Sequence, residues 1–528
     1  MPAQRSPFVL KLLPSFSDFA FLMPIVLLFS LMGGTRVLLG DGDTGWHIRG
    51  GEWIVANHRI PLQDVFSFSK PGDPWFAWSW LADVGYAWLN SMAGLRGVVL
   101  FSILLISVIF TLLFHLVCAK SNPIVAILVT VAAAGASSIH WLARPHLITL
   151  LFAVLFYASL ERFSELNQGV NPGPRPAGIR YLAILPLGIV LWANIHRGFF
   201  VGILTIAIFG AGELLKIVFS DNPNESRGGW FQAGWYFATA LACVAASLIN
   251  PYTYRLLRHV TSYLGSSSNW LNVSEYQSPN FHGPTAIPFE LMLVLAAAAI
   301  YWNLSKCRFT VPLLLLLWLH AALVAQRNVA IFAVIAAVPV GRTIQECLDE
   351  LPRWNVAGWI RTVALQFNRL AARTGETEAV GRWHLVSALG LLMVAAVMWA
   401  PNPPKAFRAE FDPDRYPAGA LATLRSHPSA RIFTDDEWGD YLIWSLYPSQ
   451  KVFVDGRDDF YGHDFEQTFA NVINVKYDWE QTLDRFGVDT VLLPVKAPLA
   501  GALKESSRWR VIFDDGVALV FRSAGKAA

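Results

Sequence analysis

The sequence is short of charged residues. Only 15% of its 528 residues are charged and 54% are hydrophobic, whereas a soluble globular protein carries about 25% charged residues. A soluble fold is excluded for most of the chain, and the composition predicts a polytopic membrane protein. The 41 Lys and Arg against 38 Asp and Glu leave a formal net charge of +3. This balance lacks the basic footprint of a nucleic-acid-binding protein, so we expect no nucleic-acid partner.

Cysteine is also scarce, and its placement excludes two kinds of cross-link. The chain has four cysteines, with no CxxC pair and none after residue 401, so neither a disulfide framework nor a cysteine-based zinc site is expected. A cleavable leader is not expected either, because the first apolar run, 19–39, is longer than a signal-peptide core and lacks a small-residue cleavage site. We interpret that run as a retained first membrane span.

Long apolar runs are what the chain has in abundance. A membrane-spanning helix needs about 20 apolar residues, and on this measure the sequence predicts about eleven spans. They lie at 19–39, 97–118, 122–139, 146–162, 181–195, 199–219, 233–250, 287–304, 310–325, 328–343 and 384–400.

The basic residues between these runs predict the orientation. Lys120, Arg162, Lys306 and the basic 342–382 segment fall on one side, and cytoplasmic loops carry the excess of Lys and Arg. We therefore expect a multi-pass protein of the cell inner (plasma) membrane with a cytoplasmic N-terminus. The outer segments would be 40–95, 140–146, 195–198, 251–286, 326–328 and the tail from Pro401 onward.

The long first outer loop, 40–95, contains tryptophans at helical spacing. Amphipathic, Trp-rich helices lie flat at the level of the lipid headgroups. We expect two such interfacial helices, one carrying Trp46, Trp53 and Ile54 and the other carrying Trp75, Trp78, Leu81 and Trp88.

The composition changes after Pro401-Asn402-Pro403-Pro404 to that of a soluble domain. We therefore divide the chain into a membrane domain, 1–400, and an extracytoplasmic α/β domain, 401–528. Alternating apolar runs predict strands, the last two joined by a hairpin at Asp514-Asp515-Gly516. The expected strands are 431–434, 451–455, 490–493, 509–513 and 517–522, and the expected helices are 436–446, 464–486 and 498–506.

Two carboxylates open the first outer loop, in Gly40-Asp41-Gly42-Asp43. Sugar transfer from a phosphate-linked donor needs a base for the acceptor hydroxyl and positive charge for the departing phosphate. Asp41 and Asp43 are the candidate bases. Asp43 could instead cap the helix that follows, by accepting hydrogen bonds from the amides of Gly45 or Trp46.

Arginines at the expected outer face are contrary to the positive-inside rule, so the presence of each one calls for a structural or functional explanation. A guanidinium binds phosphate with two hydrogen bonds and never loses its proton. One shared anionic ligand would explain all of them, and snorkelling to lipid headgroups is the alternative. The candidate phosphate ligands are Arg49, Arg144, Arg197 and Arg327.

Four histidines lie close to these arginines in the sequence: His47, His140, His146 and His196. They could orient the arginines, bind substrate, ligate a metal or bond backbone at helix ends. No HxxxH pair or carboxylate at ligand spacing occurs with them in one helix. We assign no metal ligand from the sequence, and a divalent metal stays open as a cofactor.

Two acidic loops follow expected strands of the C-terminal domain, Thr434 to Asp440 and Asp455 to Asp459. Ligands often bind at the carboxyl ends of parallel strands, so the two loops could share a glycan or ion site. Helix caps and solvated turns are the alternative, because acidic residues are common caps.

The order of these features resembles the GT-C superfamily of integral-membrane glycosyltransferases, which includes protein mannosyltransferases, aminoarabinose transferases and oligosaccharyltransferases. Five segments of the chain are similar to a group of mostly uncharacterised bacterial members of this superfamily. They are Asp41 to Ile54, Pro61 to Ser67, Trp78-Ser79-Trp80-Leu81, Tyr441 to Trp444 and Val454 to Arg457. The resemblance implies an inverting transfer from a polyprenyl-phosphate sugar at the outer face to a glycan, lipid or protein acceptor. It also implies a first-loop aspartate as base, here Asp41 or Asp43, which Gly42 separates.

Other functions fit a polytopic chain. A transporter or flippase would carry charged residues at mid-bilayer depth, whereas here the charges cluster at one face. A non-catalytic assembly or glycan-binding protein would tolerate neutral residues at both aspartates. A glycan polymerase would use a pyrophosphate-linked oligosaccharide as its donor.

Overall fold

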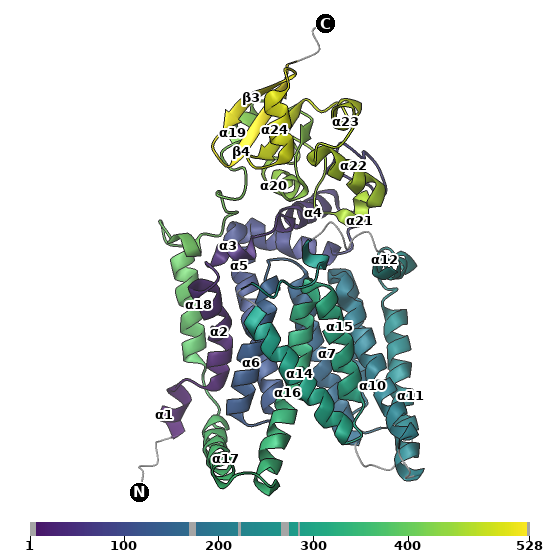
Figure 1. The fold of residues 1–528 in the computed structure, drawn as a ribbon, viewed down its shortest axis with the longest axis vertical. Coiled ribbons are helices and arrows are strands. Elements are labelled where there is room, and N and C mark those ends of the chain that lie inside the picture. Colours follow the sequence, from purple (N-terminus) through teal and green to yellow (C-terminus); the bar gives the residue numbers. More distant parts are fainter. Residues whose placement is uncertain (1–6, 168–175, 220–222, 266–273, 284–285, 525–528) are drawn as a thin grey trace.

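The computed structural model describes residues 7–167, 176–219, 223–265, 274–283 and 286–524. A bundle of long helices carries a small α/β domain at one end (Figure 1). The prediction of a polytopic α-helical membrane protein with a C-terminal α/β domain is confirmed. Two parts of the expected outer loop 251–286, residues 266–273 and 284–285, lie outside the described residues.

The first half of the membrane part contains both short and long helices. In chain order they are α1 (Pro7–Leu12), α2 (Phe16–Ser30), α3 (Thr35–Leu38), α4 (Asp43–Asn57), α5 (Trp80–Cys118), α6 (Pro123–Ser137), η1 (Ser138–His140), α7 (His146–Asn167), α8 (Arg180–Ala183), α9 (Leu185–Ile195), η2 (Arg197–Phe199) and α10 (Phe200–Val218).

The second half of the membrane part continues the bundle. Its elements are α11 (Pro223–Ala246), α12 (Tyr254–Gly265), η3 (Ser274–Tyr276), α14 (Ala286–Ser305), α15 (Thr310–Val324), η4 (Gln326–Asn328), α16 (Val329–Glu350), η5 (Leu351–Arg353), α17 (Gly358–Glu378) and α18 (Leu385–Met398).

Each expected span contains a helix, although the lengths differ. Within the described ranges, seven helices are long and apolar enough to cross a membrane, and three shorter apolar helices cover 180–195, 310–324 and 385–398. The helix α11, which carries the expected span 233–250, belongs to neither group. The first span ends at Ser30 rather than at residue 39, because Gly33 and Gly34 have φ of 86° and 91° and end the helix there.

The first outer loop supplies two helices, as predicted. The first is α4, and the second is the start of α5, which Gly94 (φ 61°, ψ −159°) separates from the rest of that helix. Trp75 and Trp78 lie before α5 begins at Trp80, so they are not part of a helix and that detail of the prediction is wrong. Figure 1 shows α4 lying across the ends of the bundle, between the membrane helices and the C-terminal domain.

The C-terminal domain, from α19 to β4, is built on a four-stranded sheet of order β1-β2-β4-β3. The pair β1 and β2 is parallel, and the expected hairpin β3–β4 is antiparallel. The elements from Lys405 onward are η6 (Lys405–Phe407), α19 (Leu421–Arg425), β1 (Ile432–Phe433), α20 (Asp436–Leu446), α21 (Asp458–Tyr461), α22 (His463–Ile473), α23 (Trp479–Arg485), β2 (Thr490–Pro494), α24 (Pro498–Glu505), β3 (Trp509–Asp514) and β4 (Ala518–Ser523).

Two predictions for this domain are wrong. The segment 451–455 is not a strand: Val452 makes only isolated bridges, to Ile432 and to Ser67 of the first loop. The expected helix 464–486 is two helices, α22 and α23, because Val475 and Asp478 take positive φ and interrupt it.

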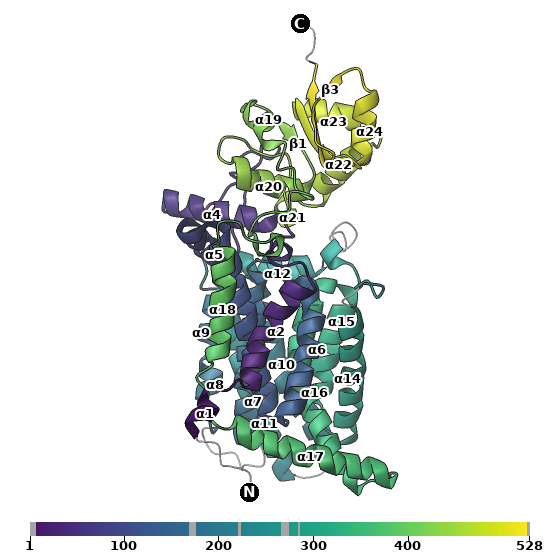
Figure 2. The ribbon, with the colours of Figure 1, turned by 90° about the vertical axis from the view of Figure 1, so that its left-hand side faces the viewer.

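The C-terminal domain packs directly on the first loop, as Figure 2 shows from the side. Arg457, which is 2% exposed, pairs with Asp64 of that loop at 2.7 Å and with Asp455 at 2.6 Å. Arg49 of α4 donates to the carbonyl of Trp444 in α20. These buried contacts bring the acidic loops of the C-terminal domain to the first-loop aspartates.

Candidate active site

Two adjoining cavities lie at the end of the membrane helices that carries the C-terminal domain, and the smaller one is closed by that domain. The smaller, of about 70 Å³, is lined by residues of α4, of the loop before α5, of η3 and of Gly456 to Asp459. The larger, of about 270 Å³, is mainly apolar and lies between α10, α15 and α16. Both cavities are lined by His140, His146, His196, Arg197, Tyr276 and Arg327.

Asp43 lines the smaller cavity, and Asp41 supports it from behind. Asp43 is the first residue of α4, but its side chain does not cap the helix; its Oδ1 instead accepts from Trp46 Nε1 at 3.0 Å. Asp41 takes the structural role, because its Oδ1 accepts from the backbone N–H of Asp43 at 2.8 Å. The cap interpretation of Asp43 is therefore wrong, and its carboxylate is left to face the cavity.

Arg144 joins the first loop to the end of the bundle that carries the C-terminal domain. It donates to Asp41 Oδ2 at 2.7 Å and also pairs with Asp43. On its other side it lies 3.5 Å from Glu275 of η3. One guanidinium thus holds three carboxylates, and its five N–H donors allow this arrangement.

The pKa values of these carboxylates diverge. Burial raises the pKa of Asp43 to about 7, with Arg144 opposing the shift and Asp41 adding to it. Burial acts on Glu275 in the same sense, but Arg327 and Arg144 hold its pKa well below its usual range. Asp43 is therefore poised to exchange a proton near neutral pH, whereas Glu275 stays ionised.

A third carboxylate reaches Asp41 and Asp43 from the C-terminal domain. Asp440 of α20 is 2% exposed, and one oxygen from each of Asp41, Asp43 and Asp440 lies within 4.8 Å of the others. Burial, and then the charges of Asp43 and Asp455, raise the pKa of Asp440 well above its usual range.

Two glycines leave room for this carboxylate group. A Cβ on Gly456 would lie 2.5 Å from Asp43 Oδ1 and 2.6 Å from Asp440 Oδ2, and one on Gly42 would lie 2.6 Å from Asp440 Cβ. Larger residues at these positions would collide with the acidic side chains. Three oxygen ligands in a recess of this kind suit a hard divalent cation such as Mg²⁺ or Mn²⁺.

The other cavity arginines are held by carboxylates. Arg327 donates to Glu275 at 2.9 Å and to the hydroxyl of Tyr276. Arg197 lies 3.7 Å from Asp459 of α21. That carboxylate also accepts from Trp78 Nε1 at 2.8 Å, so it links the first loop, the membrane helices and the C-terminal domain.

Within the described residues, the site histidines contact neighbouring side chains and backbone groups. His47 Nδ1 lies 2.6 Å from Asp83 Oδ1, and burial holds the pKa of His47 well below its usual range. His146 Nε2 donates to the carbonyl of His140 at 2.9 Å. His196 Nδ1 lies 2.8 Å from Thr149 Oγ1 and accepts from the N–H of Gly198.

Most of the residues selected from the sequence come together in space. The cavities bring together Asp43, His47, His140, Arg144, His146, His196, Arg197 and Arg327, with Asp41 just behind them. Arg49 does not join them, because it pairs with Glu52 and with the Trp444 carbonyl.

Sequence reasoning missed His259 and the convergence of Asp440 on the first loop. His259 stacks on Trp78 with ring centroids 4.6 Å apart and lies 3.6 Å from Asp459; no local motif marks it. Asp440 belongs to the acidic loop singled out above, but its partners are remote in sequence. Asp435 of the same loop is a helix cap, accepting from Trp438 N–H at 2.7 Å.

Comparisons with solved structures place the fold. The chain aligns with the Archaeoglobus fulgidus oligosaccharyltransferase, solved as a complex with Zn and sulfate, over 91% of this chain and 68% of that chain, with a TM-score of 0.51 and 13% identity. It also aligns with ArnT from Cupriavidus metallidurans in the apo state (TM-score 0.49, 13% identity, 95% and 97% coverage) and bound to undecaprenyl phosphate (TM-score 0.46, 14% identity, 95% and 97% coverage).

The protein therefore shares its overall fold with the Archaeoglobus fulgidus oligosaccharyltransferase, which agrees with the fold that the sequence resemblance implied. No protein-family model and no curated protein sequence matches the chain. At 13% identity the likeness establishes the fold alone, and activity has to be argued from the site.

Proposed function

We propose that the protein is a glycosyltransferase that moves a sugar from a polyprenyl-phosphate donor to a glycan, lipid or protein acceptor. The reaction would occur at the membrane face that carries the C-terminal domain, which we expect to be the outer face. One observation carries the proposal. Asp43, a buried carboxylate whose pKa burial raises to about 7, lines the smaller cavity together with Arg197 and Arg327, and these two arginines also line the larger, mainly apolar cavity.

The larger, mainly apolar cavity fits a lipid-linked donor. Its walls include Phe200, Val201, Val324 and Ile331, and Arg197 and Arg327 stand where it meets the polar cavity. The prenyl chain would lie along the apolar walls, with its phosphate at the two guanidiniums. Each guanidinium has five N–H donors, so each can bind phosphate while it keeps a carboxylate contact.

Asp43 is the base that this geometry favours, because it lines the cavity and Asp41 does not. Asp43 would accept the proton of the acceptor hydroxyl as that oxygen bonds to the anomeric carbon. The bond from that carbon to the phosphate oxygen breaks, and the lipid phosphate leaves with the electron pair. Attack from the side opposite the phosphate inverts the anomeric configuration.

Asp41 and Asp440 would hold a divalent cation next to Asp43, in the recess that the glycines leave open, and Asp43 would then stay available as the base. Such a cation supplies positive charge beside the leaving phosphate when bound. Arg144 keeps the carboxylates together, and Glu275 keeps Arg144 and Arg327 in position.

The test uses protein purified in mild detergent and lipid mass spectrometry. We expect a polyprenyl-phosphate sugar to co-purify with the wild type, to be retained by Asp43→Asn and to be depleted at least tenfold in Arg197→Gln/Arg327→Gln. Asp73→Asn is the matched control, because Asp73 is an exposed acid of the same loop.

The rate of sugar transfer to the acceptor is measured as loss of the donor sugar. It should fall at least 100-fold in Asp43→Asn, as is typical when a general base is removed. It should stay unchanged in Asp73→Asn. Full turnover by Asp43→Asn would contradict the assignment of the base. Bulk phospholipid alone in every preparation would favour a non-catalytic assembly protein.

A further inference from the structure

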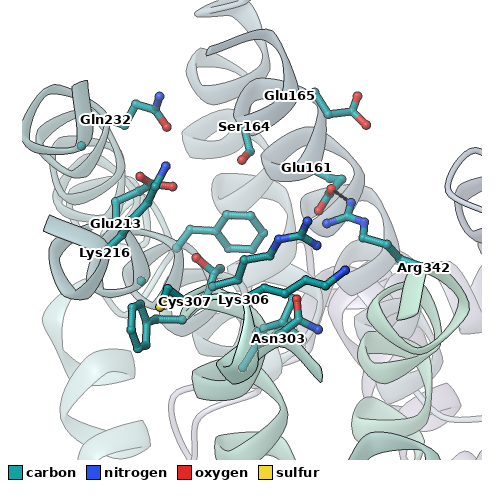
Figure 3. A pocket seen from close by; sticks show the side chains of 18 of the residues that line it. Glu161, Ser164, Glu165, Glu213, Lys216, Gln232, Asn303, Lys306, Cys307 and Arg342 are labelled. Carbon is teal, nitrogen blue, oxygen red and sulfur yellow. Dashed lines mark hydrogen bonds and ion pairs between the residues drawn. The ribbon is translucent and has the colours of Figure 1, made fainter. Parts of the chain in front are cut away.

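A second polar cavity lies at the far ends of the membrane helices (Figure 3). It has a volume of about 810 Å³ and lies among α7, α10, α11, α15 and α16. The helix α7 starts at His146 in the candidate active site and ends at this cavity after 22 residues, a length of about 33 Å at 1.5 Å per residue. The two sites are therefore on opposite faces of the bundle, and the second takes no part in the proposed transfer.

The lining of this cavity carries both signs of charge in nearly equal number. Five cationic side chains and four carboxylates line the cavity. The cations are Lys120, Lys216, Lys306, Arg308 and Arg342, and the carboxylates are Glu161, Glu165, Glu213 and Glu346. A purely anionic or purely cationic ligand would meet repulsion from one set, whereas a zwitterion could satisfy both.

Most of these charges are fixed by ion pairs. Glu161 pairs with Arg342 and lies 3.3 Å from Lys120. Glu346 pairs with Lys306 at 3.1 Å and with Arg308 at 2.6 Å. Lys306 also pairs with Glu350 at 2.7 Å. One carboxylate does not use all five N–H donors of Arg308, so Arg308 can bind a further anion beside Lys306.

Glu213 differs from the other carboxylates. It lies in the membrane-spanning helix α10 and faces the cavity, and it makes no ion pair within the part of the chain described. Figure 3 shows Glu213 on the wall opposite Glu161 and Arg342, with Lys306 reaching between the walls. Lys216, one turn further along the same helix, acts on Glu213 electrostatically but forms no ion pair with it in the described structure. A carboxylate left without an ion pair near a helix end can bind the cationic group of a ligand.

We propose that this cavity binds the headgroup of a zwitterionic phospholipid that carries a primary ammonium group, of the phosphatidylethanolamine class. The phosphodiester accepts hydrogen bonds from Lys306 and Arg308, and the ammonium donates to Glu213. The ends of membrane helices lie at headgroup depth, and Phe209, Phe309 and Leu314 supply apolar surface for the first carbons of the acyl chains. The volume suits a headgroup, since small-molecule sites run from about 300 to 1,000 Å³.

The test is native mass spectrometry of the purified protein with an equimolar mixture of phosphatidylethanolamine and phosphatidylglycerol of identical acyl chains. The wild type should retain the ethanolamine lipid at least fivefold better. Glu213→Gln should lose this preference, and Lys306→Gln/Arg308→Gln should bind both lipids at least tenfold more weakly. Arg162→Gln is the control, because Arg162 is 56% exposed, is basic and lies outside the cavity lining.

Two outcomes would overturn the proposal: equal retention of the two lipids by the wild type, or an unchanged preference in Glu213→Gln. Displacement by glycerophosphoethanolamine at the same concentration as the lipid would show a soluble ligand and reject the lipid. The Glu213→Gln substitution breaks no ion pair of the described structure, so we expect this variant to fold. Its result can therefore be interpreted even if the double variant is unstable. The thermal unfolding temperature of each variant reports its folding.

Discussion

Asp43 is buried, pairs with the guanidinium of Arg144 and lines the cavity. Because its pKa is raised, we expect the transfer activity to depend on pH near neutrality. A base must be deprotonated to act, and burial raises the pKa of Asp43 to about 7. Without a bound divalent cation, whose charge would lower this pKa, the kcat/KM for transfer should therefore rise with pH and level off above 7, and at pH 6 it should be about tenfold below the plateau.

The variant Asp41→Asn should move this midpoint to lower pH, because the charge of Asp41 raises the pKa of Asp43. The profile is measured with donor and acceptor at low concentration. A flat profile between pH 5.5 and 8 in the wild type would show that Asp43 is not the group that titrates.

Asp440 provides a separate test of the proposed cation site. Removing one of the two carboxylate ligands lowers the affinity for a divalent cation, because ligand charge sets the affinity. We expect Asp440→Asn to weaken Mn²⁺ binding by about tenfold or more, measured by electron paramagnetic resonance. Asp514→Asn, in the exposed β3–β4 hairpin, should bind Mn²⁺ as the wild type does. Equal affinities in the two variants would remove Asp440 from the site.

At the level of the elements, α4 is held against α5 by a close approach at Gly51. A Cβ there would lie 1.9 Å from the carbonyl oxygen of Asp83, so Gly51→Ala must push the two helices apart. Because α4 carries Asp43 and His47, the shift should also reduce transfer. Overpacking of this kind costs about 1–3 kcal/mol, measured as a lower thermal unfolding temperature.

Gly85, in α5, is the matched position for that experiment, because a Cβ there meets nothing within 4 Å. Gly85→Ala should stabilise the protein by about 0.5–1 kcal/mol, the usual gain for replacing glycine within a helix. If both substitutions have the same small effect, α4 does not contact α5 as closely as described.

At the scale of the whole molecule, the C-terminal domain is part of the site, because it supplies Asp440 and the loop from Gly456 to Asp459. Arg457 connects it to the first loop. Arg457→Met would leave Asp64 and Asp455, both buried, without their cation. Breaking a buried pair costs about 3–5 kcal/mol, so the domain should separate and limited proteolysis should cut the first loop faster.

Arg508→Met is the control for Arg457. Its side chain is 41% exposed and pairs with Asp484 and Glu480, and surface pairs contribute about 0–1 kcal/mol. Proteolysis of this variant should match the wild type. Equal rates for both variants would mean that Arg457 does not hold the domain in place.

The sequence by itself determined the features that depend on neighbours along the chain. Apolar runs of span length located the membrane helices, and local turn residues located the β3–β4 hairpin. Arginines in short loops between apolar runs identified Arg144, Arg197 and Arg327 as site candidates, because a charge next to the membrane needs a partner.

Only the tertiary structure decided which candidates share a cavity. Asp440 meets Asp43 because the C-terminal domain packs on α4, and Arg49 leaves the site because α20 offers it the Trp444 carbonyl. The segment 451–455 is not a strand in the structure, where Val452 makes isolated bridges to Ile432 and to Ser67 of the first loop. Distances between segments remote in sequence are set by packing, which local periodicity does not encode.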